Sequence, residues 1–152
     1  MNATPTTIQK IVLLFWSTYF TLISLTNSLD ALKALGVIPQ SFTFTSGNFD
    51  FVVQTTAPHG VPMFANAIMF AGVILLEISS AVLFWRAFRN REERNLYPAF
   101  AVGLILFAGF VVSDEIFISY PIEATHMRIF LGLLVSLITI IILKNYAREK
   151  HV

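Results

Sequence analysis

Four long stretches of this chain are almost free of charged residues, and they constrain its fold more than any other feature. They run from residue 11 to 29, 60 to 85, 95 to 113 and 129 to 143. A transmembrane helix needs about 20 predominantly apolar residues. The last stretch has only 15 residues, so its helix must begin near residue 125 and include Arg128. The sequence therefore predicts membrane spans over about 10–29, 62–85, 96–118 and 125–143.

The composition excludes an ordinary soluble domain. Of the 152 residues, 56% are hydrophobic and only 12% are charged, whereas soluble domains carry about 25% charged residues. A chain of this length cannot hide that much apolar surface in one small core. We expect a single all-α membrane domain over residues 1–152, with four transmembrane helices in an antiparallel bundle. The absence of cysteine excludes disulfides and thiolate metal ligands.

Lysine and arginine are distributed unevenly between the connections, which predicts the orientation in the membrane. Eight of the ten fall on one side, and cytoplasmic loops are the ones enriched in these residues. The eight are Lys10, Arg86, Arg89, Arg91, Arg94, Lys144, Arg148 and Lys150. Both termini are therefore predicted to be cytoplasmic, in the inner (plasma) membrane. The alternative is that the first span is a cleaved signal peptide, but its length and the lack of a small-residue cleavage pattern favour a span.

The connection between the first two spans, residues 36–61, is the long outer loop of the predicted topology. Loops of this length are usually functional. Aromatic and valine residues over 42–53 suit either a short strand pair or an amphipathic segment at the membrane interface. Asn48 and Asp50 are the polar residues of this loop that we expect to make contacts.

Glu77 is the ionisable residue placed deepest in the predicted membrane. It precedes Arg86 by nine residues, which is about 13 Å along a helix. Charged groups at such a depth are costly and are functional candidates by default, and burial without a cation favours the neutral carboxyl. Glu77 could serve in a proton relay, ligate an ion or bond to a cofactor. Alternatively, it is a protonated packing residue bonded to Ser17, Thr21 or a backbone carbonyl.

A second ionisable group gathers at the outer ends of the third and fourth spans. Its members are Asp114, Glu115, Glu123, His126 and Arg128. An arginine inside a span usually pairs with a carboxylate, so we predict a salt bridge from Arg128 to Asp114 or Glu115. Such a pair can be a structural staple as well as a functional group.

Histidines on the outer side raise the question of a metal or haem. His59, Glu123 and His126 are candidate metal ligands, because nitrogen and oxygen ligands suit several divalent metals and Glu123 precedes His126 by three residues, a spacing used in carboxylate metal proteins. Axial ligation of a haem by the two histidines is another alternative, and solvated side chains are the simplest. No nucleophile motif or phosphate-binding glycine loop is present. We therefore predict no catalytic residue, and an enzyme is the less favoured class.

Several short motifs resemble a bacterial family of predicted small integral membrane proteins of unknown function. They are SGNFDFVVQTT (46–56), LLEISSAVLFWRA (75–87), DEIFISY (114–120) and HMRIF (126–130). The resemblance implies a four-span plan with a long first outer loop, and it singles out Asn48, Glu77, Glu115 and Arg128. It implies no activity. The TAPHGVP segment (56–62) departs from the family pattern, so no role for His59 carries over.

These observations favour a small accessory or structural subunit of a larger membrane assembly, or a self-associating protein, in contact with lipid and not with nucleic acid. The alternative function is the handling of a metal, haem or protons by Glu77 with the outer group of Asp114, Glu115, His126 and Arg128. A transporter is less favoured, because no inverted repeat and no proline-broken span is visible.

Overall fold

The computed structural model describes residues 5–90 and 92–149, and helices make up most of this part of the chain. Four helices are long and apolar enough to cross a membrane, and the described ranges contain no strand. They are α1 (Pro5–Ala34), α3 (Met63–Asn90), α4 (Glu93–Ile116) and α5 (Tyr120–Glu149), with the short α2 (Asn48–Thr56) and the 3-10 helix η1 (Ala57–His59) between the first two. The predicted all-α, multi-pass membrane fold is thus confirmed.

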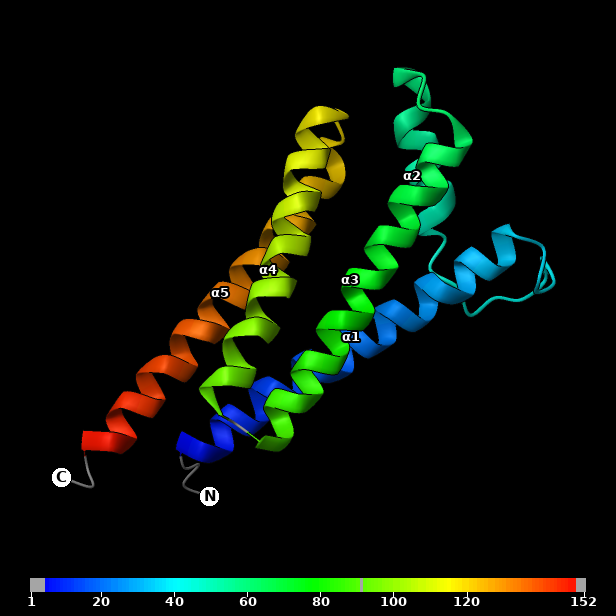
Figure 1. Cartoon of the computed structure of the whole chain (residues 1–152). Coiled ribbons are helices and arrows are strands. Elements are labelled where there is room, and N and C mark those ends of the chain that lie inside the picture. Colours follow the sequence, from blue (N-terminus) through cyan, green and yellow to red (C-terminus); the bar gives the residue numbers. More distant parts are fainter. Residues whose placement is uncertain (1–4, 91, 150–152) are drawn as a thin grey trace.

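The long helices are arranged in chain order and alternate in direction (Figure 1). α3 packs against both α1 and α4, α4 packs against α5, and α1 meets α5 over a shorter stretch. The start of α1, the end of α3, the start of α4 and the end of α5 lie at one end of the bundle, which we call the terminal end. The connection through α2 and the α4–α5 turn lie at the other, the loop end. This is the antiparallel bundle that the sequence predicts.

Most of the helices extend beyond the apolar stretches that predicted them, because polar residues continue the backbone hydrogen bonding at the helix ends. α1 ends in a Schellman motif around Gly36, whose φ is 72°. The Val37 amide donates to the Leu32 carbonyl at 2.9 Å, and the Gly36 amide donates to Lys33 at 3.0 Å. Glycine adopts this left-handed conformation without strain, so it ends the helix and turns the chain toward α2.

Aromatic side chains from three helices form the core. The Phe20 ring of α1 stacks on Phe84 of α3 with centroids 5.4 Å apart, and Phe84 meets Phe100 of α4 edge to face at 5.0 Å. Both geometries are favourable for ring pairs. Gly103 of α4 allows this approach, since a Cβ there would lie 3.1 Å from the Phe20 ring. The core thereby fixes the spacing of α1, α3 and α4.

The outer loop contains a helix where a strand pair was one of two expectations, so the strand interpretation is wrong. α2 directs Thr56 into the bundle and leaves Asp50 and Gln54 exposed, and its Phe49 ring contacts Phe70 of α3 with centroids 5.5 Å apart. The segment is amphipathic, which agrees with the second of the two expectations for residues 42–53. The helical conformation is favoured because a side chain of α1, Asp30, accepts a hydrogen bond from a backbone amide at the start of α2.

Candidate functional site

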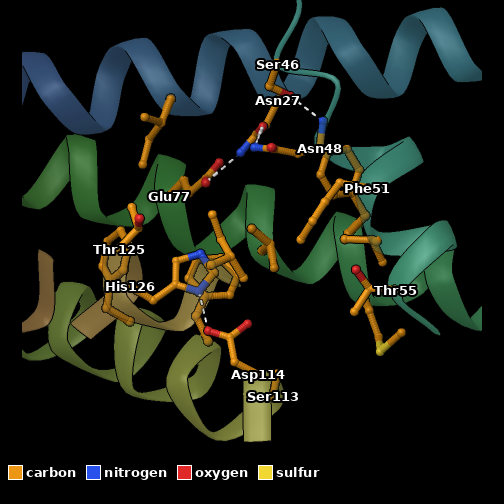
Figure 2. A pocket seen from close by; sticks show the side chains of 18 of the residues that line it. Asn27, Ser46, Asn48, Phe51, Thr55, Glu77, Ser113, Asp114, Thr125 and His126 are labelled. Carbon is orange, nitrogen blue, oxygen red and sulfur yellow. Dashed lines mark hydrogen bonds and ion pairs between the residues drawn. The ribbon is translucent and has the colours of Figure 1, made fainter. Parts of the chain in front are cut away.

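A cavity of about 560 Å³ lies between the long helices and α2, toward the loop end. Its walls are mainly apolar and come from every helix of the bundle (Figure 2). The apolar lining includes Ile23, Phe51, Phe70, Val73, Phe107, Phe110 and Ile129. The polar lining includes Asn27, Asn48, Glu77, Asp114 and His126. These polar groups form two clusters, one around Glu77 and one around His126 (Figure 2).

The first cluster is a directed chain of hydrogen bonds that ends at Glu77. The Asn48 amide of α2 donates to the Asn27 side-chain oxygen of α1 at 2.9 Å, and the Asn27 amide donates to Glu77 Oε1 of α3 at 2.7 Å. Asn27 and Glu77 are only 3% and 2% exposed. Because an ionised Glu77 can only accept hydrogen bonds, the NH2 group of Asn27 faces it. The side-chain oxygen of Asn27 then faces the NH2 group of Asn48. The chain therefore supplies a hydrogen-bond donor to Oε1 of Glu77 and none to Oε2.

The second carboxyl oxygen of Glu77 is the unsatisfied atom of this cluster. Oε2 is buried and accepts no hydrogen bond from any residue that the structure describes. Ser17 and Thr21 were predicted partners, but their hydroxyls donate to the backbone carbonyls of Leu13 and Ser17. That expectation is wrong, because one-turn backbone bonds within α1 already satisfy these hydroxyls. Oε2 therefore lacks a hydrogen-bond donor among the described residues.

Asp30 positions Asn48 by capping the start of α2. Its Oδ2 accepts the Phe49 backbone amide at 2.8 Å and the Ser46 hydroxyl at 3.2 Å. Gly47, the residue at the cap position, has no side chain to serve this purpose, so the buried Asp30 of α1 replaces it. A carboxylate at a helix start satisfies an amide and complements the helix dipole. This contact fixes the start of α2 against α1.

The second cluster is a hydrogen-bonded pair of side chains that joins α4 and α5. His126 Nδ1 lies 2.6 Å from Asp114 Oδ2, and the imidazole stacks on Phe110 with centroids 4.7 Å apart. An ionised carboxylate only accepts hydrogen bonds, so Nδ1 carries the proton that Asp114 accepts. The pair is largely buried, with side-chain exposures of 18% and 7%, and it lies on the cavity wall.

The predicted salt bridge of Arg128 is wrong. Within the described ranges Arg128 forms no ion pair with Asp114 or Glu115, and its side chain is exposed, as is that of Glu115. Residues 126 and 128 are about 200° apart around a helix, so only one of them can face α4. His126 has that position, and Arg128 faces away from the cavity.

The remaining candidates do not come together. His59 is exposed and its Nε2 lies 3.3 Å from the Phe117 carbonyl oxygen, which joins η1 to the α4–α5 turn. Glu123 is partly exposed, and Asp50 points outward from α2. Over residues 5–90 and 92–149, no three histidine or acidic side chains form a group that could hold a metal. The predicted set of His59, Glu123 and His126 is therefore not assembled.

Asn27, the central member of the chain to Glu77, is the residue that sequence reasoning missed. It follows three serine and threonine positions on α1, Thr21, Ser24 and Thr26, and its polarity amid an apolar stretch was the available signal. Comparison of the chain with family models, with curated proteins and with solved structures finds no match. The resemblance to a family of small integral membrane proteins therefore stays a prediction, and the functional argument rests on the geometry of the cavity.

Proposed function

We propose that this multi-pass membrane protein binds an amphiphilic small molecule in its cavity, with the polar group of that molecule at Glu77. The observation that carries the proposal is an apolar cavity lined by a buried carboxyl with one unpartnered oxygen. Its volume of about 560 Å³ lies within the range of about 300–1,000 Å³ that is usual for ligand pockets. Mainly apolar walls with a few converging polar groups are also typical of such pockets.

A purely structural role for Glu77 explains the site less well. A buried polar atom without a hydrogen bond costs about 1–3 kcal/mol, and an apolar residue of similar size would pack α3 without that cost. The amide chain from Asn48 through Asn27 orients the carboxyl and satisfies only Oε1. A donor group on a ligand would complete the hydrogen bonding of Oε2. Protonation of Oε2 would instead remove the charge of the carboxyl, so proton handling is the alternative use of this group.

Mass spectrometry of the purified protein tests the proposal. We expect a small molecule to be enriched with the wild type after purification in mild detergent. Val73→Phe fills the cavity and should lose this molecule, because Val73 lines the wall. Val82→Phe adds the same volume on an exposed face of α3 and should retain it. Equal recovery from all three proteins, or no enrichment from any, would refute binding in this cavity.

A second candidate function is that of a small accessory subunit, and the exposed Arg128 favours it. This arginine lies within the α5 candidate span, where a charged side chain needs an anionic partner. A carboxylate of a neighbouring subunit, or of a second copy, would supply one. In this proposal the protein resides in the inner membrane with both termini in the cytoplasm. Loss of a co-purifying partner or of a dimer in Arg128→Leu would support it, and a monomer in both proteins would contradict it.

A further inference from the structure

We infer that the ligand of this cavity carries an ammonium group that donates a hydrogen bond to Glu77 Oε2. The inference rests on the proposed binding function and specifies the chemical class of the ligand. It follows from three properties of the described lining residues: their charge, the hydrogen-bonding capacity left at Glu77, and the aromatic character of the walls.

The charge of the lining favours a cation. No described lining residue is a lysine or an arginine. His126 is the one imidazole of the lining, and it pairs with Asp114 at 2.6 Å, so this pair carries a net charge of zero or minus one whichever protonation state His126 adopts. An ionised Glu77 adds one negative charge that no described side chain neutralises. A ligand with an anionic head group would meet like charges here, whereas a cation would supply the missing partner.

The hydrogen bonds at Glu77 select a donor on the ligand. Oε1 accepts from Asn27, and Oε2 accepts from none of the described residues. A carbonyl or ether head group would bring a second acceptor to Oε2. A hydroxyl group could donate, but it would leave the carboxylate charge uncompensated. An ammonium group both donates and compensates, and charge-assisted hydrogen bonds are the stronger class.

The aromatic walls favour an organic cation over a metal ion. Tyr19, Phe70, Phe107 and Phe110 line the same cavity as Glu77. Aromatic faces attract organic cations by cation–π interaction, and the remaining aliphatic lining suits the hydrocarbon part of the ligand. A metal ion would need several oxygen or nitrogen ligands, and the described residues form no such group.

Two probes that differ in one group test the inference. Naphthylethylamine and naphthylethanol share the ring and the linker, and at neutral pH they differ by an ammonium against a hydroxyl. We expect titration calorimetry of the detergent-solubilised wild type to give at least about tenfold tighter binding of the amine, the scale of one charge-assisted hydrogen bond. Glu77→Gln should remove this preference. Glu115→Gln removes an exposed carboxylate at the C-terminal end of α4. This control variant should keep the preference for the amine.

A tethered ammonium provides a second test that does not remove Glu77. Val73 precedes Glu77 by four residues on α3 and lines the cavity, so the two side chains lie on one helix face. Val73→Lys should place its own ammonium near Oε2, fold normally and reduce amine affinity at least tenfold. Val73→Met, with similar length and no charge, should reduce it much less.

The outcomes separate the two proposals. Equal affinity of the wild type for both probes would overturn the ammonium inference while supporting a binding cavity. Failure of both probes to bind would overturn the inference and count against the proposed function. A preference for the amine that persists in Glu77→Gln, or that Val73→Lys leaves unchanged, would overturn the assignment to Glu77.

Discussion

The hydrogen bond between Asn27 and Glu77 should appear as an energetic coupling between α1 and α3. Its atoms are 2.7 Å apart and both side chains are almost completely buried. Asn27→Leu removes the donor to Glu77 Oε1 and the acceptor of Asn48, and leaves the Glu77 carboxyl without a described partner. Glu77→Met removes the carboxyl, including its unsatisfied oxygen, and leaves only the Asn27 amide unpaired. The two variants and their combination form a double-mutant cycle.

The structure sets the expected size of each change in the free energy of unfolding. Leaving a buried polar group unsatisfied costs about 1–3 kcal/mol, while hydrogen bonds between membrane helices average about 0.6 and reach about 1.7 kcal/mol. We expect Asn27→Leu to cost about 2 kcal/mol and Glu77→Met about 1 kcal/mol. The double variant should cost about 1.5 kcal/mol in place of the additive value of about 3, because it removes both partners together. The coupling is therefore about 1.5 kcal/mol, near the upper end for such pairs.

Reversible unfolding in mixed micelles, followed by the fluorescence of Trp16 and Trp85, measures these free energies. The control cycle combines Asn27→Leu with Glu115→Met, since Glu115 is exposed and outside the cavity lining. Independent sites add within about 0.5 kcal/mol, so the control cycle should show no coupling above that. A coupling of the same small size between Asn27 and Glu77 would refute the hydrogen bond and the directed chain that contains it.

Three further predictions concern α2, the core and the topology. Asp30→Ala should expose residues 48–56 to hydrogen exchange and destabilise α2 by about 1 kcal/mol, the usual value of a helix cap, while Asp50→Ala on the exposed face should leave exchange unchanged. Gly103→Leu should lower the free energy of unfolding by about 1–3 kcal/mol through overpacking. Gly109→Leu should not, because Gly109 is exposed and a Cβ added there meets no atom within 4 Å. Ser41→Cys should react with a membrane-impermeant maleimide added outside intact cells, against a wild type that has no cysteine; labelling only after lysis would invert the predicted orientation.

The four spans could be predicted because the length of an apolar stretch is a one-dimensional property. Burial in lipid needs about 20 apolar residues whatever their partners, so α1, α3, α4 and α5 were evident without any knowledge of packing. The positions of the helix ends were harder to predict. α5 continues to Glu149, beyond the apolar stretch, because its polar last turns keep their backbone hydrogen bonds outside the predicted span.

Only part of the candidate site could be predicted from the sequence. Glu77 was evident, since a charge in the middle of an apolar stretch needs no structure to be recognised. Its partner was not, because the choice between Ser17, Thr21 and Asn27 depends on how α1 is rotated against α3. The same limit explains Arg128 and His126. Both lie at the start of α5, and the rotation of that helix decided which of them faces Asp114.

The polar contacts of the outer loop also connect the position of α2 to the state of Glu77. Asn48 begins α2 and donates to the amide that in turn donates to Glu77, and Asp30 holds the same turn of α2 through the Phe49 amide. Displacing α2 therefore leaves Asn27 free to rotate and weakens the donor at Oε1. Binding at Glu77 and docking of α2 must favour each other to the same extent, because a coupling free energy between two sites is reciprocal.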